Sequence, residues 1–452
     1  MSRRARRRHA DPARKLAHSV LLAVETRDAY ANLLLADHLA ASGLSGRDAA
    51  FATALVNGTA RGLGTWDAII AAASGRDPAR LQPAVRTVLR MACQQLLAMR
   101  VPTRAAVASS VELAGEVVGE RVTGLVNAVS RRIARHDLAG WTEELSKGDE
   151  LSDLALSSLH PRWIVEAFVD LLGAEEAARA LAADNDPAPV TLVARPGLCQ
   201  VAELVAEGAE PTSASPWGAV VTGDPSRIPA VAQGRAGVQD EGSQLVTLAL
   251  TRAAGHDRPW LDVCAGPGGK AALLAACAAG RGTALCAAEL HPHRARLVAR
   301  ALEPIKGAHE VVVADATRPP WRPAAFDAVM ADVPCTGLGA LRRRPEARWR
   351  RHPEDVDALA PLQLDILTRS MELAAPGAVI AYVTCSPHRR ETTEVIEAAL
   401  ASLPVEEVDT PALLPEVTDA STGPRGRQLQ LWPHRHGTDA MFCALLRRRA
   451  EG

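Results

Sequence analysis

The sequence predicts a multi-domain protein with an all-α N-terminal domain, a small α+β middle domain and an α/β C-terminal domain. Its 452 residues exceed what one hydrophobic core ordinarily serves, so several domains are expected. Apolar residues recur with helical spacing in the first third of the chain, and short apolar strands alternate with helices after about residue 240. The predicted parts are a basic tail at 1–11, a helical domain at 12–140, a linker with the small α+β domain at 141–237, and the α/β domain at 238–450.

Composition limits the class of protein. Hydrophobic residues make up 48% and charged residues 23% of the chain, as in globular proteins, and no apolar run is long enough to span a membrane. Asp11-Pro12 follows the basic N-terminus where a signal peptide would need an apolar stretch. The eight cysteines include no C-x-x-C pair, which argues against a zinc ribbon and a disulfide framework. We therefore expect a cytoplasmic monomer with reduced thiols, no metal site and no membrane contact.

Arginine is unevenly distributed, although the net charge is only −1. One cluster lies in the first ten residues and a second lies at 342–351. Solvated segments would explain both, but the second cluster follows a cysteine motif described below, so we expect a nucleic-acid backbone to pass there. Only four of the 51 basic residues are lysine, so a lysine inside a motif marks a position where arginine would not serve. The four are Lys15, Lys147, Lys270 and Lys306.

The N-terminal segment carries the pattern of packed helices without visible chemistry. Pro78 suits a first helical turn, and Ser45-Gly-Arg-Asp48 resembles a capping box. A buried helical face is predicted from the spacing of Leu81, Val85, Val88, Leu89, Ala92 and Leu96. Because no phosphate loop or titratable cluster occurs there, the segment predicts a binding or scaffold module. Residues 138–156 are polar and predict a linker.

A glycine-rich loop opens the α/β domain. The predicted strand Pro259–Ala265 is followed by Gly266-Pro-Gly-Gly-Lys270 and an Ala-rich helix, which places backbone N–H groups near a ligand. A phosphate-binding P-loop is excluded, because Cys264 and Ala271 occupy two of its required positions. The spacing fits a dinucleotide, with Glu289 as the ribose contact, and it equally fits S-adenosylmethionine. The loop alone leaves both open, beside a merely structural tight turn.

Three acids follow in order at predicted strand ends: Glu289, Asp315 and Asp332. Ligands in open α/β sheets bind at the carboxyl ends of strands, so the three suit a ribose diol, an adenine amino group and a reacting base. Any one of them could instead cap a helix. All three together favour a ligand site.

Two cysteines, Cys335 and Cys385, also follow predicted strands and should open onto the same cleft. Cytosine C5 attacks a sulfonium methyl poorly unless a thiolate adds to C6 and an acid stabilises the charge at N3. A second thiol could assist release of the product, and Lys270 could supply the charge that activates a thiol. Cys264 is expected to line the loop. The remaining cysteines are expected to be small buried hydrophobes: Cys93, Cys199, Cys277, Cys286 and Cys443.

These motifs resemble the Sun/RsmB family of RNA 5-methylcytosine methyltransferases. The resemblance lies in Asp-Val-Cys-Ala-Gly-Pro-Gly-Gly-Lys270, Asp-Val-Pro-Cys335-Thr-Gly and Val-Thr-Cys385-Ser, and it extends over Gln239–Gln244 and His434–Asp439. It implies a Rossmann-like S-adenosylmethionine-dependent methyltransferase domain in which Cys385 is the nucleophile, Cys335 aids release and Asp332 contacts the base. The implied cofactor contacts are Cys264, Ala265, Gly266, Pro267, Gly268, Gly269, Lys270, Glu289, Asp315 and Asp332.

The N-terminal segment resembles the NusB-like RNA-binding domain in its length, its helix count and the stretch Val122–Arg132. The combined resemblance implies RNA as partner and small-subunit (16S) ribosomal RNA as substrate, with transfer RNA as the alternative. An NAD-dependent oxidoreductase and a non-catalytic RNA-binding factor are the other classes left open. Gly266, Ala271 and Glu346 depart from the family pattern of alanine, threonine and aspartate, but none of these changes removes a thiol or a charge.

Overall fold

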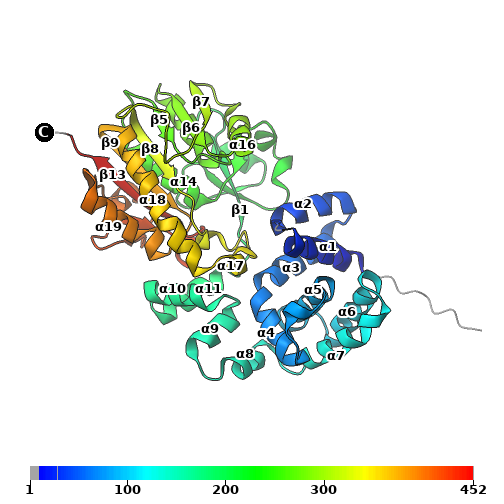
Figure 1. Cartoon of the computed structure of the whole chain (residues 1–452). Helices are drawn as coiled ribbons and strands as arrows, with labels where there is room; N and C mark the ends of the chain where they lie inside the picture. Colours follow the sequence, from blue (N-terminus) through cyan, green and yellow to red (C-terminus); the bar gives the residue numbers. More distant parts are fainter. Residues whose placement is uncertain (1–9, 28, 451–452) are drawn as a thin grey trace, which may run out of the picture. The chain divides into compact units, whose positions relative to one another are not determined.

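The chain was analysed as a computed structural model that describes residues 10–27 and 29–450. A basic tail was predicted at 1–11, and all of its arginines lie outside the described residues. Two compact units are present (Figure 1). The helical unit contains the chain up to Asp186 together with Leu341–Arg351, and the catalytic unit contains Pro187–Ala340 and His352 onward.

The helical unit confirms the predicted all-α N-terminal domain. Val85, Val88, Leu89 and Ala92 are buried, as their spacing predicts. Pro78 does not open that helix. It begins a separate 3₁₀ turn capped by Asp77, and the helix starts later. The helices are α1 Pro12–Thr26, α2 Ala31–Ser42, α3 Gly46–Arg61, α4 Leu63–Ser74, α5 Pro83–Cys93, α6 Thr103–Val117, α7 Thr123–Ile133, α8 Leu138–Ser146, α9 Glu150–Ser158, α10 Arg162–Leu172, α11 Ala174–Ala183 and α17 Ala347–Arg350.

The linker predicted at 138–156 is wrong, because that segment forms α8 and most of α9. Asp137 caps α8 by accepting from the Gly140 N–H, and Trp141 is buried with its indole N–H donated to the Ile133 carbonyl at 2.9 Å. A segment of polar average composition can therefore form helices when a few apolar residues, such as Trp141, are placed to be buried. Helices α10 and α11, predicted to lie with the small α+β domain, also belong to the helical unit.

The segment Leu341–Arg351, here named the docking segment, belongs to the helical unit although catalytic-unit sequence flanks it on both sides. Arg348 is fully buried and donates to the carbonyls of Leu159 (3.0 Å) and Asp184 (3.3 Å). The Trp349 indole N–H donates to the Arg61 carbonyl at 2.7 Å. The docking segment is therefore held by hydrogen bonds to backbone oxygens that are distant in sequence.

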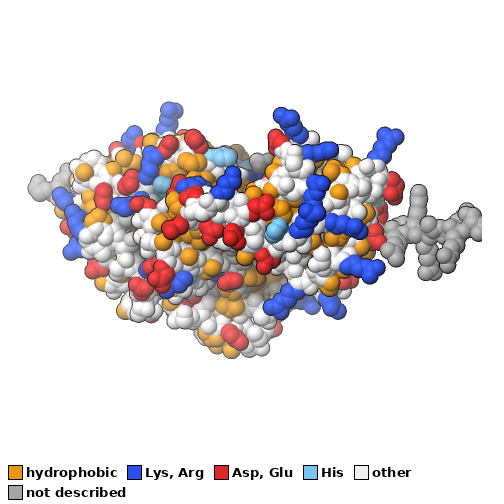
Figure 2. All heavy atoms as spheres, turned by 90° about the horizontal axis from the view of Figure 1, so that it is seen from below, with side chains coloured by type: hydrophobic (Ala, Val, Ile, Leu, Met, Phe, Trp, Pro, Cys, Tyr) orange, Lys and Arg blue, Asp and Glu red, His pale blue; other side chains and the backbone are white. Residues whose placement is uncertain are grey.

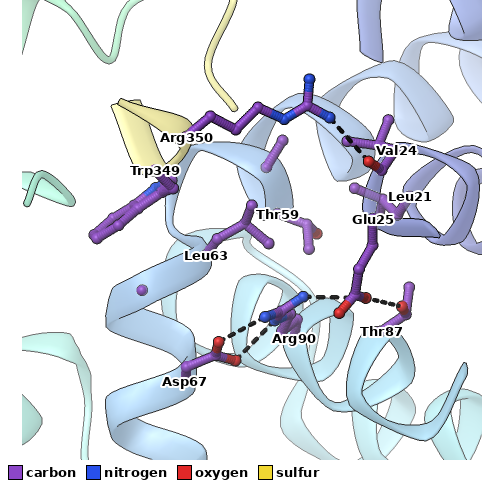
Figure 3. Close-up of a pocket in the computed structure, with 12 residues that line it drawn as sticks. Leu21, Val24, Glu25, Thr59, Leu63, Asp67, Thr87, Arg90, Trp349 and Arg350 are labelled. Atoms are coloured by element: carbon purple, nitrogen blue, oxygen red, sulfur yellow. Dashed lines mark hydrogen bonds and ion pairs between the residues drawn. The ribbon is translucent and has the colours of Figure 1, made fainter. Parts of the chain in front are cut away.

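A pocket of about 430 Å³ lies between the docking segment and helices α1, α3, α4 and α5 (Figure 3). Trp349 and Arg350 close one side, and Arg350 donates to the Val24 carbonyl at 2.9 Å. On the other side Arg90 makes two hydrogen bonds to Asp67, at 2.7 and 2.6 Å. None of the predicted site residues lines this pocket, and the charges named here are paired within the unit.

The catalytic unit begins with a small antiparallel sheet of order β2-β3-β1-β4. This confirms strand formation around Val190–Ala194, which is the central strand β1. The remaining elements are β2 Glu210–Pro211, β3 Gly218–Val221, β4 Ala236–Val238, α12 Val201–Ala206 and α13 Pro229–Ala232.

The main sheet confirms the predicted α/β domain. Strands run in the order β7-β6-β5-β8-β9 and these neighbours are all parallel, so their carboxyl ends share one edge. Strand β13 then pairs antiparallel with β9, unlike the all-parallel sheet of a dinucleotide domain. The strands are β5 Trp260–Asp262, β6 Leu285–Glu289, β7 His309–Val313, β8 Phe326–Asp332, β9 Ala374–Thr384, β10 Val405–Glu407, β11 Ser421–Thr422, β12 Gln428–Gln430 and β13 Phe442–Arg448.

Helices pack on both faces of this sheet, and the core contains apolar side chains such as Trp260, Met330 and Val379. The helices are α14 Glu241–Ala253, α15 Gly269–Gly280, α16 Pro292–Leu302, α18 Pro353–Leu373, α19 Thr393–Ser402 and α20 Pro433–His436. Among the described residues, none of the helices combines the length and apolarity needed to cross a bilayer.

Candidate active site

The glycine-rich loop joins β5 to the N-terminus of α15, as the sequence predicts. Lys270 lies in the first turn of α15, and its Nζ donates to Asp332 at the end of β8, at 2.9 Å. Burial alone would lower the pKa of Lys270, but the neighbouring Asp332 carboxylate outweighs it and leaves the lysine pKa raised. A half-buried ammonium–carboxylate pair therefore lies at the carboxyl edge of the sheet.

Glu289 ends β6 and is buried beside the loop. Its carboxylate accepts from the His291 N–H at 2.9 Å and lies 3.6 Å from the Arg294 guanidinium. A Cβ at Gly266 would approach the Glu289 Oε2 to 2.0 Å. The absence of a side chain at Gly266 thus allows this acid to lie directly against the glycine-rich loop.

Asp315 lies two residues beyond β7, not at the strand's last residue as predicted. It is exposed, and its Oδ1 accepts from the N–H and hydroxyl of Thr317 at 2.9 and 2.8 Å. Those hydrogen bonds lower the pKa of Asp315. The local contacts are those of an Asx-type cap, while the place at the carboxyl edge of the sheet is that expected of a ligand contact.

The two cysteines predicted to share the site, Cys335 and Cys385, lie in contact with each other. Cys335 follows β8, Cys385 follows β9, and their Sγ atoms lie 3.4 Å apart. The contact with Cys385 and burial raise the pKa of Cys335 well above its ordinary value. The same contact lowers the pKa of Cys385, which the Lys270 ammonium lowers further against burial and the Asp332 charge.

The contact between the two thiols and the charges around them explain this asymmetry. The hydrogen bond between the two sulfur atoms is the largest cause of both shifts. Asp332 disfavours both thiolates, Glu391 adds to this at Cys335, and Lys270 favours the thiolate of Cys385. Among the eight cysteines, all of which are described, only Cys385 has a lowered pKa. Burial raises the pKa to about 12 for Cys277, Cys286 and Cys443. Of the two adjacent thiols, Cys385 is therefore the one whose thiolate form is favoured.

Cys264 lies half-buried in the cofactor loop between Val263 and Ala265. Burial raises the pKa of the Cys264 thiol well above its ordinary value, so the thiol is inert at neutral pH. The loop residues Ala265, Gly266, Pro267, Gly268 and Gly269 connect it to Lys270, between the end of β5 and the first turn of α15.

Two residues without a predicted role also lie at this edge. Asp262 ends β5 fully buried, and burial together with the Asp332 charge raises its pKa to about 7. Gln239 is buried beside Gly269, and neither its amide oxygen nor its nitrogen has a hydrogen-bond partner. Asp262 is the first residue of the motif Asp-Val-Cys, so the sequence indicated its position at the end of a strand. The burial that raises its pKa could not be read from the sequence.

Among the arginines at 342–351, Arg342 and Arg348 are buried and are therefore withdrawn from the nucleic-acid contact that was expected of this cluster. The cluster lies in the docking segment, and only Arg344 is exposed, with its guanidinium 5.4 Å from the Tyr30 ring centre. Exposed arginines occur elsewhere on the helical unit, including Arg131 and Arg135 at the end of α7. Figure 2 shows Lys and Arg side chains over the right-hand part of the face drawn, which belongs to that unit.

Comparison with known proteins agrees with this architecture. The model of the family described as 16S rRNA methyltransferase RsmB/F matches residues 248–447, and the NusB family model matches residues 11–135. A protein named "putative methyltransferase" in Mycobacterium tuberculosis is 47% identical, and the match covers 99% of each chain. The "probable ribosomal RNA small subunit methyltransferase B" of Bacillus subtilis is 30% identical over 96% of this chain and 98% of its own length.

Solved structures support the fold. The crystal structure of PH0851 matches with a TM-score of 0.79 at 20% identity, over 98% of this chain and 100% of its own. The structure of NSun6 from Pyrococcus horikoshii with SFG matches with a TM-score of 0.56 at 17% identity, over 64% of this chain and 99% of its own. With the full-length relatives above, these findings show that the chain belongs to the RsmB/F family of methyltransferases and carries a NusB-family helical domain.

Proposed function

We propose that this protein methylates C5 of cytosine in small-subunit (16S) ribosomal RNA, with S-adenosylmethionine as methyl donor and Cys385 as nucleophile. The observation that carries the proposal is the pair of thiols 3.4 Å apart beside the Lys270–Asp332 pair. Two adjacent thiols with opposite pKa shifts suit a reaction that needs a nucleophile and a separate group for release. The relative from Bacillus subtilis, whose name refers to small-subunit ribosomal RNA, supports the choice of substrate.

The residues at the loop fit S-adenosylmethionine. Glu289 offers a carboxylate to a ribose diol, and the N-terminus of α15 suits a carboxylate. The unpaired Gln239 amide can donate to a carboxylate and accept from an ammonium, the two charges of an amino acid. When bound, the cofactor supplies an electrophilic methyl group on a sulfonium. Cys264 through Lys270, Glu289, Asp315 and Asp332 are the residues proposed to hold it.

The chain's own groups account for the remaining chemistry. The Cys385 thiolate adds to cytosine C6, and the electron pair of the C5–C6 double bond moves towards C5, where the methyl group is accepted. Asp332 can donate to N3 of the base and stabilise the charge that develops there only when it carries a proton, and the Lys270 ammonium that donates to it is placed to supply that proton. Transfer of the C5 proton to a base, for which the Cys335 thiolate is proposed, then restores the double bond and expels the Cys385 thiolate. Cys335, beside that sulfur, is the group proposed to assist this release.

Replacement of each cysteine separates these roles. Cys385→Ala is expected to abolish transfer of labelled methyl groups to ribosomal RNA, because no other described thiol has a lowered pKa. Cys335→Ala is expected to retain methyl transfer and accumulate a covalent protein–RNA adduct, visible on denaturing gels. Cys443→Ala, a buried thiol of β13, is the control and should behave as the unmodified protein.

The proposal would be wrong if Cys385→Ala retained activity, or if RNA with 5-methylcytosine were not formed by the unmodified protein. Bisulfite sequencing of the product identifies the base. Labelling of transfer RNA but not of ribosomal RNA would instead select the alternative substrate.

A further inference from the structure

Glu391 is a fully buried carboxylate directly behind the two cysteine loops. It lies in the 3₁₀ turn Arg389–Glu391 after β9 and had no predicted role. Its Oε1 accepts from the Thr336 N–H at 2.8 Å, and its Oε2 accepts from the Thr336 hydroxyl and, at 2.6 Å, from the Ser386 hydroxyl. Thr336 immediately follows Cys335 and Ser386 immediately follows Cys385, so one carboxylate joins the two loops.

A further contact ties in the residue that precedes Cys335. Gln363 of α18 donates to the Glu391 Oε1 at 3.0 Å and to the Pro334 carbonyl at 2.9 Å. Tyr382 of β9 donates its hydroxyl to the Glu391 carbonyl at 2.7 Å, which fixes the turn itself. Donors from three elements therefore converge on one carboxylate, and charge-assisted hydrogen bonds in a buried site are strong.

We propose that Glu391 is a positioning residue that clamps the Pro334–Thr336 loop to the Cys385–Ser386 loop and so sets the contact between the two thiols. The proposal deepens the proposed function, on which the catalytic meaning of this contact rests. The clamp itself consists of the hydrogen bonds described above and does not depend on which reaction the site performs. Glu391 touches neither sulfur in a hydrogen bond, and it acts through residues adjacent to each cysteine.

Glutamine at position 391 tests the clamp because it keeps the size of the side chain and replaces an acceptor oxygen with a donor. The amide keeps one acceptor oxygen and carries no charge, so the Thr336 and Ser386 hydroxyls must turn to accept from its NH₂ or the loops must move apart. In either case the charge-assisted hydrogen bonds that join the two loops are weakened. The sulfur–sulfur contact would lengthen. Cys385 would then lose the partner that lowers its pKa, while Asp332, Lys270 and Asp439 would still act on it.

The measurement is the pH–rate profile for alkylation of Cys385 by iodoacetamide, quantified by peptide mass spectrometry without RNA or cofactor. Glu391→Gln is expected to move the profile to higher pH, in the same direction as Cys335→Ala. At a pH below the thiol pKa we expect at least about threefold slower alkylation, since a shift of half a pKa unit changes the thiolate fraction by that factor. Glu394→Gln, an exposed glutamate in the next helical turn, is the matched control and should leave the profile unchanged.

Ser386→Ala is the second variant, because it removes a single donor and is less disruptive if Glu391→Gln fails to fold. A smaller shift of the same sign is expected. A profile identical to that of the unmodified protein in a folded variant, while Cys335→Ala shifts it, would overturn the clamp. A shifted profile in a protein that never methylates RNA would preserve the clamp and reject the proposed function, so the two failures are distinguishable.

Discussion

At the scale of single residues, the site depends on how a few charges are distributed around two sulfur atoms. Lys270 favours the thiolate of Cys385, and the contact of Cys335 with its neighbour leaves the pair with opposite pKa shifts. The motif spacing predicted which cysteines belong to the site. It could not distinguish them, because both follow strands of the same sheet, and their opposite pKa shifts arise mainly from the contact between the two sulfur atoms.

Asp262 carries a testable pH dependence. Its pKa in the folded chain is about 7, against an ordinary value of 3.8, so the folded state binds the proton more tightly than the unfolded state. The free energy of unfolding should therefore fall as pH rises from the unfolded pKa to the folded one. Between pH 5.5 and 7 the loss is about 2 kcal/mol at 1.36 kcal/mol per pKa unit.

Asp262→Asn imitates the protonated side chain and should remove this loss. Hydrogen exchange in a peptide covering β5, compared between variant and unmodified protein at each pH, measures it. The advantage of the variant should grow from pH 5.5 to 7. The exposed Asp257→Asn should follow the unmodified protein at every pH. An advantage that is constant with pH would show that Asp262 is charged throughout this range.

At the scale of elements, the docking segment departs most from the sequence-based expectation. A nucleic-acid backbone was predicted to pass along its arginines, but Arg348 is buried and burial lowers its pKa to about 9. Trp349 packs on a glycine of α4, since a Cβ at Gly64 would come within 2.1 Å of its ring. Composition shows that a segment is basic. It does not show that the segment packs against other residues of the same chain, as this one does.

Gly64→Ala should release the docking segment, because the added methyl group occupies the place of the Trp349 ring. The expected cost is about 1–3 kcal/mol, the range measured for overpacking. Faster hydrogen exchange across residues 341–351 and greater sensitivity to trypsin would report it. Gly124→Ala in α7 is the matched control. Nothing lies within 4 Å of its Cβ, so alanine should be neutral or stabilise by up to about 1 kcal/mol. Equal behaviour of the two variants would contradict the packing described for Trp349.

At the scale of the whole molecule, the net charge of −1 conceals exposed arginines on the helical unit. If RNA binds there, Arg131 and Arg135 are candidates to neutralise phosphates, unlike the arginines of the docking segment. Family membership covers both units, because relatives match the chain over nearly its full length. The helical unit is thus expected to contribute to RNA affinity and the catalytic unit to chemistry.

The double variant Arg131→Gln and Arg135→Gln should weaken binding to ribosomal RNA. It should also reduce the slope of log affinity against log salt by up to about two, one for each phosphate that is no longer neutralised. Fluorescence anisotropy over a salt series measures both quantities. Arg179→Gln, an exposed arginine of α11, is the control for loss of charge alone. An unchanged slope in the double variant would place RNA elsewhere on the molecule.

Local sequence patterns were enough to specify the helical domain, the parallel sheet, the glycine-rich loop between a strand and a helix, and the approach of Cys335 to Cys385. These features follow from local periodicity and from the rule that ligands meet the carboxyl ends of parallel strands, so they need no knowledge of distant contacts. Long-range packing alone produced the burial of Arg348 against Leu159, the convergence of donors on Glu391 and the raised pKa of Asp262. Each depends on partners far apart in the chain, and burial by such partners changes both charge and hydrogen bonding in ways that local patterns do not encode.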